Sequence, residues 1–283
     1  MNTQHHRRQM TSLIQREFWE HKFASFWVPI IILAISLLVW LRFNLGSASF
    51  LVDQLANLAL LPAAEARAQA TLLVAMPTLP FASSLLIVIP IYLLMCLYED
   101  RKTGSYLFWY SMPVSNTKTV LSKLITAALL MPGISLLIYL ALCLGIIFLC
   151  TLTLLLHGEP LTAIGILLAS LSRWSVQLFL LMIYLAFWLL PLYGWLLLIS
   201  AFARSVPVFW AIGLLLMLAL AERVILSSSY FSTWLSSRGL PYSEIFNNYT
   251  NLFAAMPWYE MSYGLLLGSI LLAGAIMMRR FPD

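Results

Sequence analysis

Charged side chains are scarce in this sequence. Asp, Glu, Lys and Arg make up 10% of its 283 residues, whereas soluble domains carry about 25%. Apolar residues account for 62% of the chain, and the mean hydropathy is +0.91. Several apolar runs reach the ~20 residues needed to cross the hydrocarbon core of a bilayer. A soluble protein would have to bury several such helices completely, so the composition predicts a polytopic, all-α membrane protein.

Residues and motifs that support catalysis are scarce too. The three cysteines lie inside apolar runs, and the four histidines are scattered, so neither type has the spacing of a metal or disulfide site. The sequence has no GxxxxGK[ST], GxSxG or HExxH motif and no intramembrane group of Asp, Glu and His. We therefore predict no catalytic residue, no metal and no enzymatic activity in this chain itself. The net charge of +5 is read as basic cytoplasmic loops, with no nucleic-acid partner.

Six apolar stretches predict six transmembrane helices in a single domain. Before them, residues 1–25 are basic, and Met10, Ile14 and Phe18 share one helical stripe. This pattern predicts an interfacial helix on the cytoplasmic face, the alternative being a solvated basic tail. The predicted spans are about 26–41, 76–97, 124–156, 174–202, 206–226 and 261–278.

The distribution of basic residues gives the orientation. Eleven of the 16 Lys and Arg residues fall on the side of the two termini and of the stretch Tyr98–Lys123. By the positive-inside rule, both termini and this stretch are cytoplasmic.

Two features near the C-terminus predict further structure. Ser227–Tyr259 is rich in aromatic residues and interrupted by proline and glycine. It is interpreted as a broken segment that re-enters the membrane before span six, or alternatively as an aromatic belt at the interface. Gly264 and Gly268 form a GxxxG pattern in span six, which makes them candidate helix-packing or dimer contacts.

The stretch Tyr98–Lys123 separates spans two and three and is the most informative part of the chain. Two acidic residues, two basic residues and Gly104 end one helix. A short aromatic segment, Ser105–Ser111, follows and is closed by Pro113. Ser115 or Asn116 can then cap the next helix, because their side-chain oxygens accept hydrogen bonds from free backbone N–H groups.

This stretch resembles the type-2 permease family of ATP-binding-cassette transporters. The resemblance rests on Glu99, Asp100, Arg101, Gly104, Ser105, Pro113, Val114, Ser115 and Lys123, and the order of the predicted elements agrees in outline over the whole chain. It implies that Ser105–Ser111 is a cytoplasmic coupling helix between spans two and three, docked in a groove of a separate ATPase subunit. The implied coupling interface consists of Glu99, Asp100, Arg101, Gly104, Ser105, Tyr106, Leu107, Phe108, Trp109 and Pro113.

The resemblance also implies the partners. Two permease copies, as a homodimer among membrane lipids, would bind two ATPase subunits that hold ATP and magnesium, with no cofactor in this chain. Many family members carry an acidic residue soon after the Gly-Ser pair, whereas Tyr106–Tyr110 is wholly apolar or aromatic here. Docking is therefore expected to rest on aromatic burial. The alternative is that Phe108 and Trp109 lie in the membrane interface.

The predicted function is the membrane subunit of an ATP-driven exporter in a bacterial inner membrane, working by alternating access. The spans hold few polar residues, which suits an amphipathic or apolar cargo. One alternative is a membrane anchor or assembly subunit that transports nothing. The other, an integral membrane enzyme, lacks residues to support it.

Overall fold

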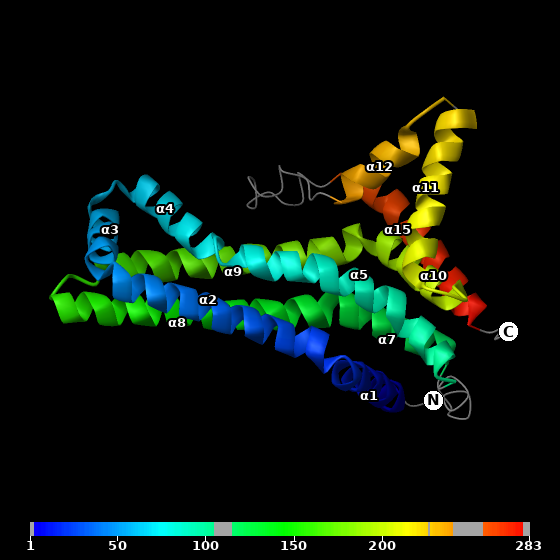
Figure 1. Ribbon diagram of the computed structural model, residues 1–283, viewed down its shortest axis with the longest axis horizontal. Helices are drawn as coiled ribbons and strands as arrows, with labels where there is room; N and C mark the ends of the chain where they lie inside the picture. The colour runs from blue at the N-terminus through cyan, green and yellow to red at the C-terminus, as the bar shows by residue number, and fades with distance from the viewer. Residues whose placement is uncertain (1–2, 105–114, 226, 240–256, 280–283) are drawn as a thin grey trace. The chain divides into compact units, whose positions relative to one another are not determined.

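The computed structural model describes residues 3–104, 115–225, 227–239 and 257–279 (Figure 1). Within these ranges the chain forms helices and no strand. Six of the described helices are long and apolar enough to cross a membrane, so the prediction of an all-α protein with six such helices is confirmed. Their bounds are Phe23–Asn44, Thr78–Lys102, Asn116–His157, Thr162–Trp188, Pro207–Ile225 and Trp258–Met278.

The chain divides into two compact units. Unit 1 contains Met1–Glu20, Val88–Leu129 and Ile183–Asp283, and unit 2 contains His21–Ile87 and Leu130–Met182. Each unit therefore collects segments that are far apart in the sequence.

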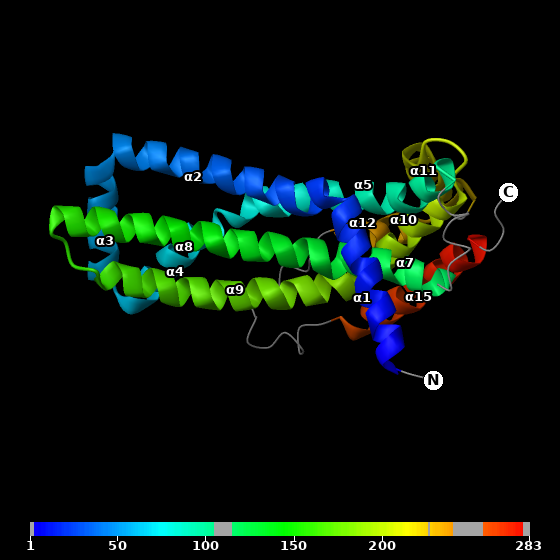
Figure 2. The same cartoon turned by 90° about the horizontal axis from the view of Figure 1, so that it is seen from below.

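Unit 2 is a bundle in which α2 and α8 run side by side (Figures 1 and 2). Its helices are η1 (Phe23–Trp27), α2 (Val28–Gly46), α3 (Ala48–Leu60), α4 (Ala63–Ala75), the first part of α5 (Thr78–Lys102), α8 (Met131–His157) and most of α9 (Thr162–Trp188). Residues 48–75 form two helices, α3 and α4. Leu61 is extended and Pro62 follows it, as expected because a proline disfavours helical backbone in the residue before it.

The interior of unit 2 is apolar, with a few neutral polar groups. Tyr139 packs edge-on against Phe81 and donates its hydroxyl to the carbonyl of Val74 at 2.8 Å. Asn44 donates its side-chain amide to the hydroxyl of Thr153 at 3.2 Å, and both side chains are buried. These bonds satisfy polar groups that water does not reach.

Unit 1 contains both the N-terminal helix and the last transmembrane helix. Its complete helices are α1 (Thr3–Glu20), α7 (Asn116–Ile125), α10 (Leu190–Phe202), α11 (Pro207–Ile225), α12 (Tyr230–Gly239) and α15 (Trp258–Met278). Ser115 is the residue that caps α7, accepting a hydrogen bond from the amide of Lys118. A five-residue π-helix, η2 (Thr126–Leu130), joins α7 to α8 just before Pro132.

The fourth span was predicted wrongly. The prediction ran from Trp174 to Phe202 as one helix, whereas α9 occupies Thr162–Trp188 and α10 is a separate shorter helix. Leu189 leaves the helical conformation two residues before Pro191, and a proline cannot continue the helical hydrogen bonding of the preceding turn. The connection between predicted spans three and four, which ended at 156 and began at 174, is correspondingly shorter, because α9 already begins at Thr162.

The helices α10 and α15 cross in close contact at two glycines. A Cβ atom on Gly194 would lie 2.9 Å from the carbonyl oxygen of Gly268. A Cβ atom on Gly268 would lie 2.9 Å from the backbone of Leu190. The absence of side chains at both positions therefore allows the two backbones to approach each other.

Candidate functional site

Four residues of the predicted coupling interface lie in the described part of the chain, at the end of α5. Glu99, Asp100 and Arg101 belong to its last turn, and Gly104 follows with φ of +68°. Glycine adopts this left-handed conformation without steric cost, which suits a helix end. The other predicted interface residues, Ser105, Tyr106, Leu107, Phe108, Trp109 and Pro113, lie outside the described residues.

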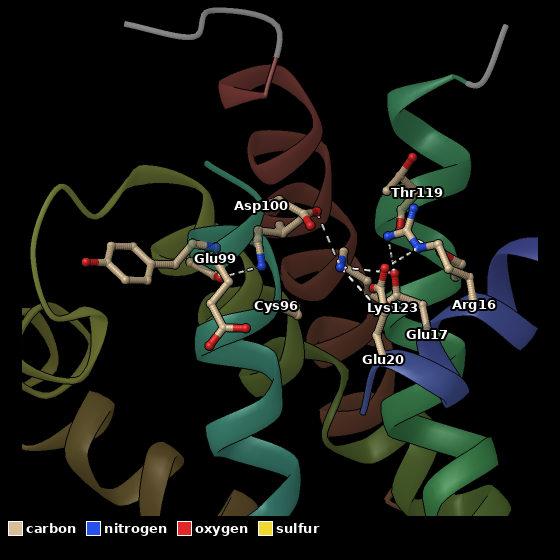
Figure 3. A network of polar contacts seen from close by, with 12 residues as sticks. Arg16, Glu17, Glu20, Cys96, Glu99, Asp100, Thr119 and Lys123 are labelled. Atoms are coloured by element: carbon tan, nitrogen blue, oxygen red, sulfur yellow. Dashed lines mark hydrogen bonds and ion pairs between the residues drawn. The ribbon is translucent and has the colours of Figure 1, made fainter. Parts of the chain in front are cut away.

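Asp100 joins the end of α5 to two other helices. Its carboxylate lies 3.4 Å from the Nζ atom of Lys123 in α7 and 3.8 Å from the guanidinium of Arg279 at the end of α15. Figure 3 shows Lys123 between Asp100 on one side and Glu17 on the other. The helices that precede and follow residues 105–114 are thus linked directly.

Lys123 also binds the N-terminal helix. Its Nζ atom lies 3.1 Å from each carboxylate oxygen of Glu17 in α1. Both side chains are almost completely buried, with exposed fractions of 0% for Glu17 and 1% for Lys123. Glu17 also accepts hydrogen bonds from Arg16 at 2.7 Å and from the hydroxyl of Tyr92 in α5 at 3.0 Å. A buried carboxylate with this many donors remains charged in the folded protein.

We call these six ionisable residues the ion cluster: Arg16, Glu17, Glu20, Asp100, Lys123 and Arg279. It contains three acids and three bases, so its formal charges cancel. Burial disfavours the charge on Glu17. The Lys123 ammonium and the Arg16 guanidinium outweigh this effect, however, and hold the pKa of Glu17 below its usual value. The cluster therefore ties α1, α5, α7 and α15 together through charged contacts with defined geometry.

Arg101 makes a second connection from the same turn of α5. Its guanidinium donates to the backbone carbonyls of Ser200, at 3.2 Å, and of Ala203 at the end of α10. The Ser200 hydroxyl in turn accepts hydrogen bonds from the amides of Leu97 and Tyr98 at 3.1 Å. Glu99, by contrast, is exposed and outside the ion cluster.

Most of the ion cluster was absent from the residues selected by sequence. Asp100 and Lys123 were selected through the family resemblance, whereas Arg16, Glu17, Glu20 and Arg279 were not selected. One signal was available, because Glu17 follows the buried Leu13 by four residues and so shares its helix face. The pairing itself depends on residues more than 100 positions apart.

The two glycines selected in α15 face other parts of unit 1. Gly268 lies against α10, as described above. Gly264 lies against the guanidinium of Arg238, where an added Cβ would come within 2.6 Å of a terminal nitrogen.

Comparisons with known proteins do not assign this chain to a family. A scan against protein-family models, a search of curated proteins and a search of solved structures found no match to this chain.

Proposed function

We propose that this chain is the membrane subunit of an ATP-driven exporter, bound to a separate ATP-binding-cassette ATPase. Two features support the proposal: the resemblance of Glu99–Lys123 to the type-2 permeases, and the six apolar helices. The ion cluster adds a physical reason why the cytoplasmic stretch could act on the bundle.

The observation that carries the proposal is that the ion cluster joins the two helices, α5 and α7, that precede and follow the predicted coupling segment in the sequence. Asp100 and Lys123 stand on the helices that flank residues 105–114 and contact each other at 3.4 Å. Lys123 continues the link to α1 through Glu17, and Asp100 continues it to α15 through Arg279. A displacement of the segment by an ATPase would therefore act on four helices of unit 1 together.

The remaining features of the proposal follow the family. Two copies of the chain would form a homodimer in a bacterial inner membrane, with both termini in the cytoplasm and an ATPase subunit under each copy. The cargo would be amphipathic or apolar, since the spans offer few charges to an ion. Alternating access would be driven by ATP in the partner, and this chain would contribute no catalytic residue.

Affinity purification of the tagged protein in mild detergent tests the proposal. We expect a soluble ATPase with a P-loop to co-purify in stoichiometric amount. Trp109→Ala should release it, because an aromatic anchor at an interface often carries much of the binding energy. Trp210→Ala is the matched control, since Trp210 lies in the apolar helix α11 and should leave the complex intact.

Two results would count against the proposal. Recovery of the protein without any ATPase would favour a membrane anchor or assembly subunit. Equal loss of the ATPase from the Trp109 and Trp210 variants would show that the effect is general unfolding, and that Trp109 does not form the docking site.

A further inference from the structure

The short helix α12 is fixed at its N-terminal end by a residue of α11. The Glu222 carboxylate accepts hydrogen bonds from the amide of Phe231 at 3.0 and 3.1 Å and from the Ser228 hydroxyl at 3.1 Å. The first amides of a helix have no partner within the helix, and a negative charge is favourable there. Glu222 therefore acts as a cap supplied by the preceding helix.

The C-terminal end of α12 is fixed by Arg238, whose exposed fraction is 1%. Its guanidinium donates to the backbone carbonyl of Trp188 at 3.3 Å and to that of Glu260. The guanidinium carbon lies 4.0 Å from the ring centre of Trp188 and 5.1 Å from that of Trp234, a cation–π arrangement. Gly264 beneath it leaves the space that this group occupies.

The bonding of this buried guanidinium is incomplete. The Nε atom of Arg238, the indole nitrogen of Trp188 and one carboxylate oxygen of Glu260 have no hydrogen-bond partner among the described residues. Arg238 bonds to the carbonyl of Glu260, and no salt bridge joins it to the carboxylate. Burial lowers the pKa of Arg238 below its usual value, although the nearby Glu260 carboxylate acts in the opposite direction. A buried charge with unsatisfied donors gains hydrogen bonds when it moves into water or pairs with a carboxylate.

The two attachments of α12 therefore differ in kind. At the N-terminal end, the partly exposed carboxylate of Glu222 accepts hydrogen bonds from donors of the helix end. At the C-terminal end, the guanidinium of Arg238 is buried, and its Nε atom has no hydrogen-bond partner among the described residues. Between these ends only one face of α12 is covered: Phe231, Trp234 and Leu235 are half-buried, whereas Ser232, Thr233 and Ser236 are exposed.

We infer that Arg238 is a releasable clasp that holds α12 against the start of α15 and the end of α9. When Arg238 withdraws, α12 turns about its Glu222 attachment and uncovers Trp188 and Gly264. This inference concerns the side of unit 1 that bears α12, and it does not depend on the proposed ATPase.

Hydrogen–deuterium exchange of the full chain in detergent or nanodiscs tests the clasp without a mutation. Amides of α12 should exchange together and at least about tenfold faster than those of α10, because a short helix that is released when Arg238 withdraws opens at low free energy. Exchange in α12 as slow as in α10 would overturn the inference.

Variants separate a releasable clasp from a permanent packing contact. Arg238→Ala should speed exchange in α12 by a further factor of about ten while leaving α10 unchanged. Arg238→Lys, which keeps a cation but loses the planar stacking group, should give an intermediate rate. Arg223→Ala is the matched control, since Arg223 is an exposed arginine near the end of α11 and its loss should leave α12 unchanged.

Two outcomes with variants would contradict the clasp. One is an unchanged exchange rate in α12 of Arg238→Ala. The other is faster exchange throughout unit 1, which would mean that Arg238 supports the whole unit and does not release α12 selectively. Should Arg238→Ala fail to fold, Arg238→Lys and the wild-type comparison still decide the question.

Discussion

The two units of this protein use buried polar groups differently. In unit 2 the polar side chains buried among the described residues are neutral, such as Asn44 and Thr153, which bond to each other. In unit 1 the buried polar side chains include the ionisable groups of Glu17, Lys123 and Arg238. Both units have apolar interiors otherwise, so the placement of charge is not a general requirement of this chain.

The difference indicates what the charges in unit 1 contribute. Removing an ion from water costs several kcal/mol, and a buried ion pair often gives no more stability than well-packed apolar residues. The advantage of a buried ion pair lies in its geometry, because each charged group is stabilised only by a group of opposite charge at a suitable distance. We therefore expect the ion cluster to fix how α1, α5, α7 and α15 are joined, and unit 2 to depend on apolar packing.

The largest expected effect comes from removing one partner of the buried pair. Lys123→Met leaves the Glu17 carboxylate buried without its nearest ammonium and should destabilise the protein by about 3–5 kcal/mol. Thermal unfolding in detergent measures this loss. The double variant Glu17→Met, Lys123→Met should recover most of it, because both charges are then absent.

Lys118→Met provides the control for this experiment. Lys118 lies in the same helix and donates to Gln9, but it is only partly buried, so its loss should cost less than about 1 kcal/mol. Equal losses of stability from Lys123→Met and Lys118→Met would mean that burial of Lys123 does not increase its contribution to stability.

Overpacking at the contact between α10 and α15 in unit 1 should give the next largest loss of stability. This loss tests whether close helix packing, as well as buried charge, distinguishes unit 1 from unit 2. Gly268→Ala places a methyl group 2.9 Å from the backbone of Leu190 and should cost about 1–3 kcal/mol through overpacking. Gly213→Ala is the matched control, because nothing lies within 4 Å of the added Cβ. The same unfolding measurement should show no loss of stability for Gly213→Ala, and equal changes in stability from the two substitutions would contradict the close approach at Gly268.

In unit 2 a neutral pair should be easier to replace than the ions of unit 1. Thr153→Val leaves the amide of Asn44 without its side-chain partner and should cost about 1 kcal/mol. Adding Asn44→Leu should restore much of the stability, since both polar groups are then gone. A loss in unit 2 as large as that from Lys123→Met would remove the contrast between the units.

Acidity should affect the two units differently. Because the pKa of Glu17 is lowered in the folded state, its charge contributes stability above the usual value of about 4.3, and this contribution disappears as pH falls through the lowered folded pKa. The difference in melting temperature between wild type and Glu17→Gln should therefore be constant near neutral pH and shrink in acid. The corresponding difference for Thr153→Val should not depend on pH, and a parallel decline in both would contradict the assignment to Glu17.

The fold was largely predictable because hydropathy and proline are local signals. Six apolar stretches of adequate length indicated six long helices, and Ser115 before α7 was one of two predicted caps. The fourth span failed because the apolar composition continues unbroken across Leu189, so hydropathy alone could not locate the separation of α9 from α10. The effect of Pro191 within that continuous stretch was underestimated.

Only the part of the candidate site at the end of α5 was predictable from the sequence. Asp100 and Arg101 could be selected because they end a span beside a turn, whereas Glu17 and Arg279 enter the cluster from the two ends of the chain. Their pairing with Lys123 and Asp100 depends on tertiary packing, which a single sequence does not encode as a spacing. Arg238 was likewise not selected, because its contacts with Trp188 and Glu260 are equally non-local.

ATP turnover of the proposed complex with an ATPase tests most directly whether the ion cluster couples the predicted coupling segment, residues 105–111, to the bundle. The comparison is between wild type and the Glu17→Met, Lys123→Met variant, each purified with its co-purifying ATPase and measured against the free ATPase. We predict that the wild-type protein changes the turnover, and that the double variant still binds the ATPase and folds but no longer changes its turnover. If the double variant affected turnover as the wild type does, the ion cluster would not transmit the coupling, and the central claim would be wrong.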